Sequence, residues 1–486
     1  MTNLPLSSTF EYSADWYLPE HPDVRVSGRL TYTSERAEIQ LNDAFTPMRG
    51  DLLSAPIPDY PVIHGISTKG EALTVLRAQR LGINFNFGPA GLRQPERLIS
   101  SWLIVGAHVS AEQKYYRVNF FIPGLEIWLS SANIGQSIEQ DSNSERITHT
   151  FVVRQTDSEI TAAPAIDATL EWRTGTTLRT VLSKSVSIDV LGSVSISPAT
   201  PKPIDWFFEQ QGKLSTMMAF LAGRPMPIDA ISAHISETTQ PISLLVAMRQ
   251  ADKYEFKSIN DFLVPRSKLG DSFPSVVANW FREVESVLVP SQLALGILST
   301  KDLWLHIEFL SLIQALEGFH RGRYGGNYMD DSDYESVKAT LGSAIPATIS
   351  NDHRDALRSR IRYGNQISLS KRLNELCGCL GDDLAQVVFA TSGKIPRRWI
   401  DTRNYHTHWD EELRQDTIDG QEMYNANARM EHFLRLLYLL LMGVTKETLL
   451  ECYENSNGAS LQLIQLNIIA RQRPDPTQAA GVIMGI

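Results

Sequence analysis

The sequence predicts an α+β multidomain protein in which a β-rich N-terminal domain precedes an all-α helical bundle. Up to about residue 196, short runs alternate apolar and polar residues close to period two, which is the pattern of half-buried strands. From about residue 300, apolar residues recur at spacings of three and four, as they do on one face of a helix. Between the two patterns, residues 197–203 contain three prolines, which indicate a linker.

Four ranges describe the expected domain organisation. They are a β-rich domain at 1–196, a mixed, largely helical connecting region at 204–295, a helical bundle at 300–456 and a C-terminal tail at 457–486. In the first range, alternating runs are separated by clusters of Gly, Pro, Asn and Asp, which is typical of a sandwich or a barrel. The strands are expected at 23–32, 37–41, 116–120, 147–152 and 186–190.

The helices follow from the change of period. Two are expected in the connecting region, near 206–221 and 273–288. The first helix of the bundle follows Thr300, a good N-cap, and ends at Gly325-Gly326. Further helices are expected near 334–343, 352–362, 368–377, 384–390, 398–415 and 420–452.

The charge balance excludes one class of function. The net charge is −10, from 45 Lys and Arg against 55 Asp and Glu. Non-specific binding along nucleic acid depends on neutralising phosphates, so this balance argues against a protein that coats RNA or DNA. Residues 351–403 depart from the average, with ten Lys and Arg against six Asp and Glu. This local excess fits an RNA-binding surface.

Two observations predict a cytoplasmic location. The three cysteines, Cys377, Cys379 and Cys452, are too few for an extracellular disulfide framework. The N-terminus lacks the basic residue and the apolar stretch of a signal peptide. The longest apolar run, 434–444, contains Arg435 and is shorter than the ~20 residues that a membrane span needs. We therefore expect no membrane partner.

The segment 400–410 holds the residues best suited to chemistry. Arg403, Asn404, His406 and His408 place a guanidinium, an amide and two imidazoles within six residues. Imidazole is well matched to proton transfer near neutral pH, and guanidinium matches a phosphate or a phosphorane-like transition state. Together they suit metal-independent RNA cleavage by the ribose 2′-OH. That reaction needs a base, an acid for the leaving 5′-oxygen, and a cation at the non-bridging oxygens.

The spacing limits how one chain can use these groups. Asn404 and His408 are four residues apart and share a helix face, whereas Arg403 and His408 are about 140° apart on a regular helix. Because we expect a helix start here, Arg403 would lie in a frayed first turn or its side chain would curl round. A symmetric dimer with abutting helices would bring two copies of Arg403 and His408 into one cleft.

The motif Arg403-Asn404-x3-His408 resembles the R-x4–6-H motif of HEPN-type ribonucleases, which also lies on a late helix of an all-α bundle. The segment 315–321 resembles the first-helix signature of the ApeA-like HEPN subfamily. The β-rich part, with Gly28 in a strand and the stretch 102–108, is similar to the ApeA N-terminal domain. The resemblance covers about residues 5–455, and the Arg/Asn/His motif is its sharpest element.

This resemblance implies a bacterial anti-phage, abortive-infection protein that acts as a dimeric HEPN endoribonuclease. His408 would be the acid and base, Arg403 the cation at the phosphate, and Asn404 the residue that orients the site. The products would carry a 2′,3′-cyclic phosphate, and no metal or other cofactor would be needed. The side chains that would line the same cleft are His406, Glu317, His320 and Arg321.

The implied partners are an RNA substrate, with tRNA among the candidates, a second copy of the chain, and a phage-derived trigger at the N-terminal region. The residues expected to bind RNA adjoin the motif and are Lys394, Arg397 and Arg398.

Two other interpretations stay open from the sequence. His406-x-His408-x-Asp410 is similar to the H-x-H-x-D-H metal ligands of metallo-β-lactamase-fold hydrolases, with Glu411 in place of the last histidine. That pattern would give a metal-dependent hydrolase. Alternatively, the protein is a non-catalytic helical scaffold or binding protein, in which the motif only holds the dimer together.

Overall fold

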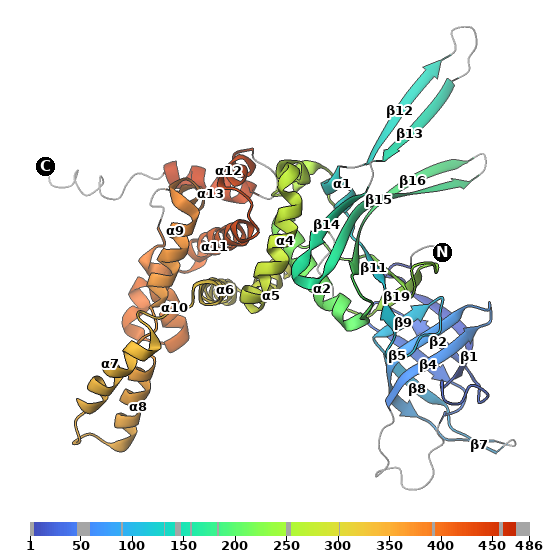
Figure 1. The fold of residues 1–486 in the computed structure, drawn as a ribbon, viewed down its shortest axis with the longest axis horizontal. Coiled ribbons are helices and arrows are strands. Elements are labelled where there is room, and N and C mark those ends of the chain that lie inside the picture. Colours follow the sequence, from blue (N-terminus) through green and yellow to red (C-terminus); the bar gives the residue numbers. More distant parts are fainter. Residues whose placement is uncertain are drawn as a thin grey trace. The chain divides into compact units, whose positions relative to one another are not determined.

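The computed structural model describes residues 4–45, 59–88, 91–130, 132–140, 147–155, 158–181, 184–248, 254–300, 302–390, 394–455 and 460–472. Contacts divide the chain into two compact units, Met1–Ser215 with Met226–Ile259, and Thr216–Pro225 with Asn260–Ile486. The first unit is β-rich and the second is helical, which confirms the predicted fold class (Figure 1). The four domain ranges expected from the sequence stay predictions.

One antiparallel sheet of thirteen strands dominates the first unit. Its order is β14 (Glu159–Ala163), β15 (Ala168–Val181), β16 (Ser185–Pro198), β11 (Arg117–Phe121), β18 (Ala230–His234), β19 (Ile242–Val246), β9 (Trp102–Val105), β5 (Ala72–Ile83), β4 (Asp59–Ser67), β1 (Phe10–Tyr17), β2 (Val26–Tyr32), β3 (Ala37–Leu41) and β8 (Glu96–Ser100).

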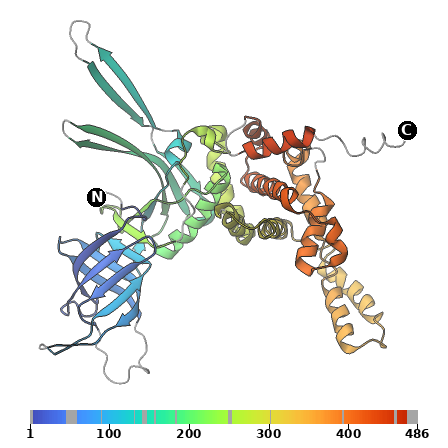
Figure 2. The ribbon, with the colours of Figure 1, turned by 180° about the vertical axis from the view of Figure 1, so that it is seen from behind.

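Part of this sheet closes into a barrel, because β8 pairs with β5 as well as with β3. The closed ring is β5-β4-β1-β2-β3-β8, drawn in blue shades and visible from behind in Figure 2. β5 serves both parts of the sheet: Leu73–Leu76 pair with β9, and Gln79–Ile83 pair with β8. Arg77 lies between these segments with a φ of 55°, an uncommon conformation for a non-glycine residue. The backbone distortion thus coincides with the change of partner.

Smaller elements complete the first unit. They are the ribbon of β12 (Ala132–Gln140) with β13 (Ile147–Gln155), the pair β6 (Asn86–Gly88) with β7 (Gly91–Arg93), the pair β10 (Lys114–Tyr115) with β17 (Lys202–Pro203), helix α1 (Leu125–Leu129) and the 3-10 turn η1 (Pro164–Ile166). The proline-containing segment 197–203 lies inside this unit and partly in strands, not in a free linker. Proline is tolerated at the ends and edges of strands, where its missing N–H is not needed.

Helices form the second unit, together with part of α2 (Ile204–Ala222), whose first residues belong to the first unit. They are α3 (Arg266–Leu269), α4 (Phe273–Glu283), α5 (Leu288–Ser299), α6 (Leu305–Tyr324), α7 (Asp331–Ser343), α8 (Asn351–Arg362), α9 (Leu369–Phe389), α10 (Arg397–His408), α11 (Gly420–Leu441), α12 (Lys446–Glu454) and α13 (Leu461–Gln472). Short 3-10 turns are η2 (Ile259–Asp261), η3 (Gly270–Ser272), η4 (Val284–Val287) and η5 (Glu411–Asp416).

The core of this unit lies where α6, α9 and α11 pack together. Tyr438 of α11 stacks on Phe220 with ring centroids 4.3 Å apart and meets Phe319 of α6 edge-on at 5.0 Å. α10 packs against α6 and α9, so the segment with the predicted motif lies against the central helices. Among the described helices, none is both long and apolar enough to cross a membrane.

Several helix boundaries differ from the expected ones. Thr300 is not the N-cap of the first bundle helix, because it caps the C-terminus of α5, and Trp304 takes the N-cap position of α6. The segment 273–288 is divided among α4, η4 and the first residue of α5.

The segments 368–377 and 384–390 belong to one helix, α9, which is kinked at Gly381 (φ 75°, ψ 171°). The segment 420–452 is divided, because α11 ends at Leu441 and Gly443 adopts a φ of 88° before α12. The segment 398–415 is also divided, since α10 ends at His408 and η5 follows.

Candidate functional site

Helix α10 carries the predicted motif and is fixed by its buried face. The proline before it, Pro396, takes the N-cap position, and Trp399 packs near Phe389 of α9 with ring centroids 6.0 Å apart. The buried Thr402 hydroxyl donates to the Arg398 carbonyl at 2.6 Å and accepts from the Ile418 N–H at 2.9 Å. This bond ties α10 to the segment before α11. The next residues along the helix therefore have a defined direction.

The motif lies at the end of α10, and the expectation of a helix start at Arg403 is wrong. Local sequence offered no typical stop, because the residue after His408 is neither glycine nor asparagine. Trp409 adopts the left-handed conformation (φ 53°, ψ 41°) and donates its N–H to the Tyr405 carbonyl at 2.6 Å. This is the geometry of a C-terminal cap, which glycine usually provides. Arg403 is thus held in regular helix, not in a frayed turn.

Arg403 is anchored on two sides. Its Nη1 donates to the Asn404 Oδ1 at 3.2 Å, and its Nη2 lies 3.8 Å from the Glu317 Oε2 on α6. Glu317 also accepts from Arg321, through Nε at 3.2 Å and Nη2 at 2.9 Å. Two guanidinium groups therefore share one carboxylate, which leaves the Glu317–Arg321–Arg403 cluster with a net positive charge. The Arg403 side chain is 28% exposed and remains accessible to an anion.

His408 differs from Arg403 in its surroundings. It is the last residue of α10, and its side chain is exposed. Within the described residues, no hydrogen bond or ion pair holds its imidazole. One chain thus supplies an anchored cation and, further round the same helix, a free proton-transfer group.

His320 lies beneath the surface and not in an open cleft. Its side chain is 1% exposed, with Nε2 2.7 Å from the Glu375 Oε2 and Nδ1 3.2 Å from the Arg372 Nη1. The buried Arg372 also donates to the carbonyls of Gly325 and Gly326, at 2.9 and 3.1 Å. This network closes the C-terminal end of α6 against α9. His320 therefore belongs to the packing of the bundle.

His406 faces another imidazole. Its ring stacks on that of His306 at the start of α6, with centroids 6.0 Å apart and an interplanar angle of 21°. Burial first, and then the neighbouring His306, lowers the pKa of His406. His406, His408 and Asp410 do not converge: the described residues contain no group of three or more His, Cys, Asp or Glu side chains that could hold a metal ion.

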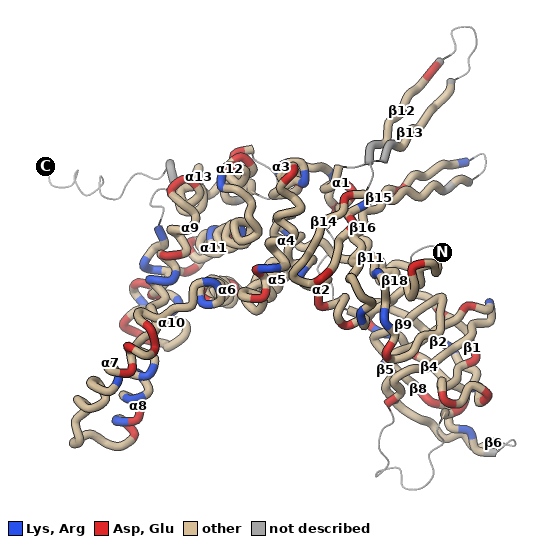
Figure 3. Tube along the Cα trace, in the orientation of Figure 1, with Lys and Arg blue, Asp and Glu red and all other residues tan. Residues whose placement is uncertain are grey.

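Arg397 and Arg398, two of the predicted RNA-binding residues, pair with carboxylates of the same chain. Arg397 Nε pairs with the Asp401 Oδ1 at 3.1 Å, and Arg398 Nη1 pairs with both oxygens of Glu422 at 2.7 and 2.8 Å. Lys394 is exposed before α10. Figure 3 shows basic and acidic residues interspersed along α8 and around α10. The local positive excess is therefore partly neutralised, and the roles of these residues in RNA binding stay predictions.

Two family models match the chain. The model of ApeA N-terminal domain 1 matches residues 11–280, more than half of the chain, and that of the Apea-like HEPN domain matches residues 310–448. The chain belongs to the ApeA-like HEPN family. This confirms the family that the motif and the two domains predicted. Neither a curated protein nor a solved structure matches the chain.

The HEPN match includes every residue of the Glu317–Arg321–Arg403 cluster, as well as Asn404 and His408. It begins after the first residues of α6, so Trp304 and His306 lie outside it. The residue range matched by the HEPN family model therefore does not indicate that the start of α6 lies beside the motif. That proximity appears only in the folded bundle.

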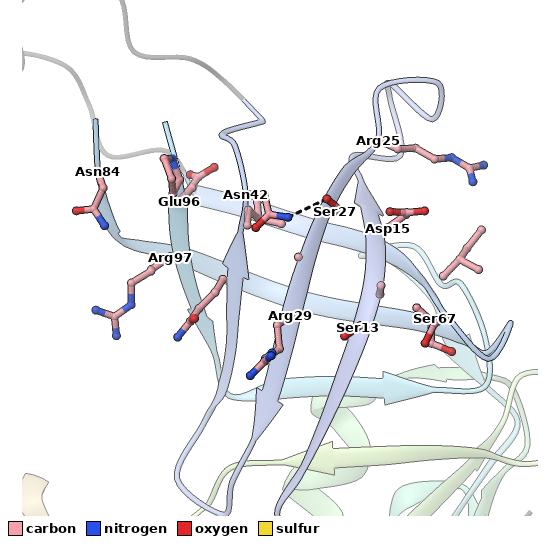
Figure 4. A pocket seen from close by; sticks show the side chains of 17 residues that line it. Ser13, Asp15, Arg25, Ser27, Arg29, Asn42, Ser67, Asn84, Glu96 and Arg97 are labelled. Atoms are coloured by element: carbon pink, nitrogen blue, oxygen red, sulfur yellow. Dashed lines mark hydrogen bonds between the residues drawn. The ribbon is translucent and has the colours of Figure 1, made fainter. Parts of the chain in front are cut away.

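The ApeA N-terminal domain has a pocket of its own, on the barrel. Its volume is about 920 Å³. It is lined by residues of β1, β2, β3, β4 and β8 and of the adjoining loops, including Asp15, Arg25, Arg29, Asn42 and Arg97 (Figure 4). Asn42 Nδ2 donates to the Ser27 hydroxyl at 2.9 Å across this surface. The mixture of guanidinium, carboxylate and amide groups suits a polar ligand better than an apolar one.

A pair of carboxyl groups in the HEPN bundle was not anticipated. Glu308 of α6 lies beside Glu431 of α11, and burial first, and then this neighbour, raises the pKa of Glu308 to about 7. Asn427 Nδ2 donates to the Glu308 Oε2 at 3.0 Å. The partners are more than a hundred residues apart, so no local pattern could have joined them.

Proposed function

We propose that this protein is an anti-phage HEPN endoribonuclease that cleaves RNA without a metal ion, at a site formed by α10 of two chains. The observation behind the proposal is that α10 carries both Arg403 and His408. The Arg403 guanidinium is anchored by Asn404 and Glu317, and the exposed His408 imidazole has no hydrogen-bond partner among the described residues. HEPN domains usually form dimers and act on RNA, which agrees with this arrangement. The matched ApeA-like family supplies the link to phage defence.

In the proposed reaction, the ribose 2′-OH attacks the adjacent phosphorus while His408 of one chain accepts the hydroxyl proton. The bond from phosphorus to the 5′-oxygen breaks, and a protonated His408 of the partner subunit gives its proton to that oxygen. The products are a 2′,3′-cyclic phosphate and a 5′-hydroxyl. Because one imidazole cannot be both base and acid in the same turnover step, two chains are required.

Arg403 would stabilise the charge that develops on the non-bridging oxygens. Its contacts support this role, since Asn404 and Glu317 restrict the guanidinium before RNA arrives and so lower the cost of orienting it. Arg321 would add a second positive charge at the entrance. Lys394, Arg397 and Arg398 would contribute to RNA binding, the two arginines by exchanging their intramolecular carboxylate partners for phosphates.

The β-rich first unit would regulate this activity. We propose that it receives a phage-derived trigger, and that the barrel pocket beside Arg29 and Arg97 is the candidate place for a polar group of that trigger. RNA, including tRNA, is the proposed substrate class of the bundle.

The decisive experiment compares purified wild type, His408→Ala and His353→Ala incubated with total RNA in EDTA. His353 is an exposed histidine of α8 and serves as the matched control. We expect the wild type and His353→Ala to leave 2′,3′-cyclic phosphate ends, and His408→Ala to lose at least about 100-fold in rate, as for loss of a general acid–base. All three variants should keep the same Tm.

Full cleavage by a folded His408→Ala protein would contradict the proposal. Cleavage that EDTA abolishes would favour the metal-dependent hydrolase. If the wild type protects cells from phage and the His408→Ala variant protects equally well, the non-catalytic scaffold is the better account.

A further inference from the structure

Five rings gather beside the motif, where the start of α6 meets the end of α10. We call the group Trp304, His306, Tyr405, His406 and Trp409 the aromatic cluster. Trp304 lies 6.2 Å from His306, His306 lies 6.0 Å from His406, and His406 lies 6.4 Å from Trp409, all between ring centroids. Tyr405 lies 5.9 Å from Trp409. The rings form a continuous row from one helix to the other.

The two tryptophans at the ends of this row are open to solvent. Trp304 is 73% exposed and Trp409 is 70% exposed. Indole is the largest side chain and buries the most apolar area when it is covered. Two indole rings this exposed in one cluster are unusual on a protein surface that has no binding partner. At each end of the row, an indole ring therefore exposes a flat face to solvent.

Trp409 also occupies a backbone position that does not favour it. Its φ of 53° lies in the left-handed region, where a bulky residue is strained and glycine would be at ease. Such strain persists where the side chain has another use, and it concentrates at functional sites. Trp409 follows His408 directly, so the strained ring is fixed next to the proposed acid–base group.

We propose that the aromatic cluster is a stacking platform for unpaired bases of single-stranded RNA, next to the phosphate that is cleaved. The proposal rests on the proposed function and specifies its substrate as RNA with bases free to stack. Proteins bind single strands by combining stacked aromatic rings with a positive surface that follows the backbone. Here α6 and α10 provide both, the aromatic cluster and the Glu317–Arg321–Arg403 cluster.

Charge determines which way the strand would lie. Trp409 is followed by Asp410, Glu411 and Glu412, all exposed, which would repel phosphates on that side. The sugar–phosphate backbone would therefore follow Arg403, and the bases would lie over the rings. His406 suits this role because burial lowers its pKa, which favours a neutral ring for stacking over a cation for phosphate.

A second copy of the chain is a less suitable occupant for this patch. In the proposed dimer two copies of His408 flank one phosphate, so the ring faces beside them have to stay open for the nucleotides on either side of that phosphate. The rings are also edged with imidazole and indole nitrogens instead of the aliphatic groups of an oligomer core.

The test measures binding in the full-length His408→Ala background, so that it does not depend on cleavage. The probe is a fluorescein-labelled unpaired RNA dodecamer, with a fully paired duplex of equal length as comparison. We expect Trp304→Ala and Trp409→Ala each to weaken binding of the single strand about tenfold, with little effect on the duplex. Trp409→Phe should keep most of the affinity, because a flat ring remains. Tyr363→Ala, at an exposed tyrosine after α8, is the matched control and should change nothing.

Trp409→Gly separates binding from folding. Glycine relieves the positive φ, so this variant should have a Tm at least equal to that of the parent and still lose the single strand. Unchanged binding by Trp304→Ala and Trp409→Gly would overturn the proposal, as would equal losses on single strand and duplex. A change of oligomeric state on light scattering, with RNA binding intact, would identify the aromatic cluster as a contact between copies and also overturn it. Absence of cleavage by the wild type would refute the proposed function but leave the binding result standing.

Discussion

The helical unit contains two charged networks, one around Arg372 and His320 and the other around Arg403 and His408. The two networks differ in their exposure to solvent. In the first, Arg372 and His320 are each about 1% exposed and share their hydrogen bonds with Glu375 and two glycine carbonyls. In the second, Arg403 is partly exposed and His408 has no partner among the described residues. The same residue types thus support packing in one place and are free for chemistry in the other.

This difference explains why residue type alone is a poor guide to function in the bundle. His320 lies in the segment that resembles the family signature, yet its bonds are used within the protein. A buried charge needs all its partners, because removing one leaves the others unpaired at low dielectric. An exposed charge can leave its partner at little cost, which is what binding a phosphate requires.

The largest expected effects come from replacing each of the two arginines, Arg372 and Arg403, with methionine in separate variants. Arg372→Met should lower the free energy of unfolding by about 3 kcal/mol, because His320 and the carbonyls of Gly325 and Gly326 lose their donor. In a unit of this size that corresponds to a Tm lower by roughly 10 °C. Arg403→Met should leave the Tm unchanged and reduce cleavage at least about 100-fold. Thermal unfolding and initial rates on the same RNA measure both.

Equal losses of stability in the two arginine variants would remove the distinction between the networks. Cleavage retained by a folded Arg403→Met variant would show that the open network has another purpose.

Glu317→Gln sharpens the comparison within the open network. Glutamine still accepts a hydrogen bond, but the Glu317–Arg321–Arg403 cluster gains one positive charge. RNA should bind a few-fold more tightly and with a steeper salt dependence, whereas kcat should fall a few-fold because Arg403 is held less firmly. Titration at several salt concentrations and saturation kinetics separate the two effects. Glu335→Gln, an exposed site on α7, is the matched control, and identical behaviour of both variants would contradict the anchoring role.

The smallest expected effect concerns Glu308, whose side chain is less buried than that of Arg372 and less exposed than that of His408. Its pKa is raised from 4.5 to about 7, so between these values the folded protein keeps a proton that the unfolded chain has released. The free energy of unfolding should therefore fall as the pH rises through this window. Glu308→Gln keeps an acceptor for Asn427 and a donor for Glu431 without the charge. It should stabilise the protein by about 1 kcal/mol at pH 8, allowing for solvent screening, and by less towards pH 5.

Urea unfolding of wild type, Glu308→Gln and the exposed control Glu412→Gln at both pH values tests this directly. A stabilisation by Glu308→Gln that is the same at pH 5 and pH 8 would mean that the carboxyl pair does not titrate in the window.

Local patterns predicted much of the fold and of the motif. The end of α6 at Gly325 followed from glycine at the C-terminal cap, and the alternating runs at 37–41 and 116–120 correspond to β3 and, one residue shifted, to β11. The grouping of Arg403, Asn404 and His408 on one element needed only their spacing. In each case the signal lies within a few residues of the feature, so the sequence contains it.

The missed features depend on partners far away in the chain. β8 closes the barrel by pairing with β5, which no alternation within either strand could indicate. The stacking of His306 on His406 joins residues one hundred positions apart. The end of α10 was missed for a different reason, because Trp409 takes a conformation that its residue type disfavours. A functional role of the Trp409 side chain, and not the backbone propensity of tryptophan, would explain why this residue occupies the position.

The barrel closure has a consequence for how the first unit meets other chains. A strand at the end of a sheet normally presents a row of free N–H and C=O groups on which another chain can build. β8 ends the sheet order but is hydrogen-bonded along both sides, to β3 and β5. At that end the sheet gives no template for aggregation or strand exchange. Within the described residues, β14 at the opposite end pairs only with β15, so its outer side could accept an incoming strand.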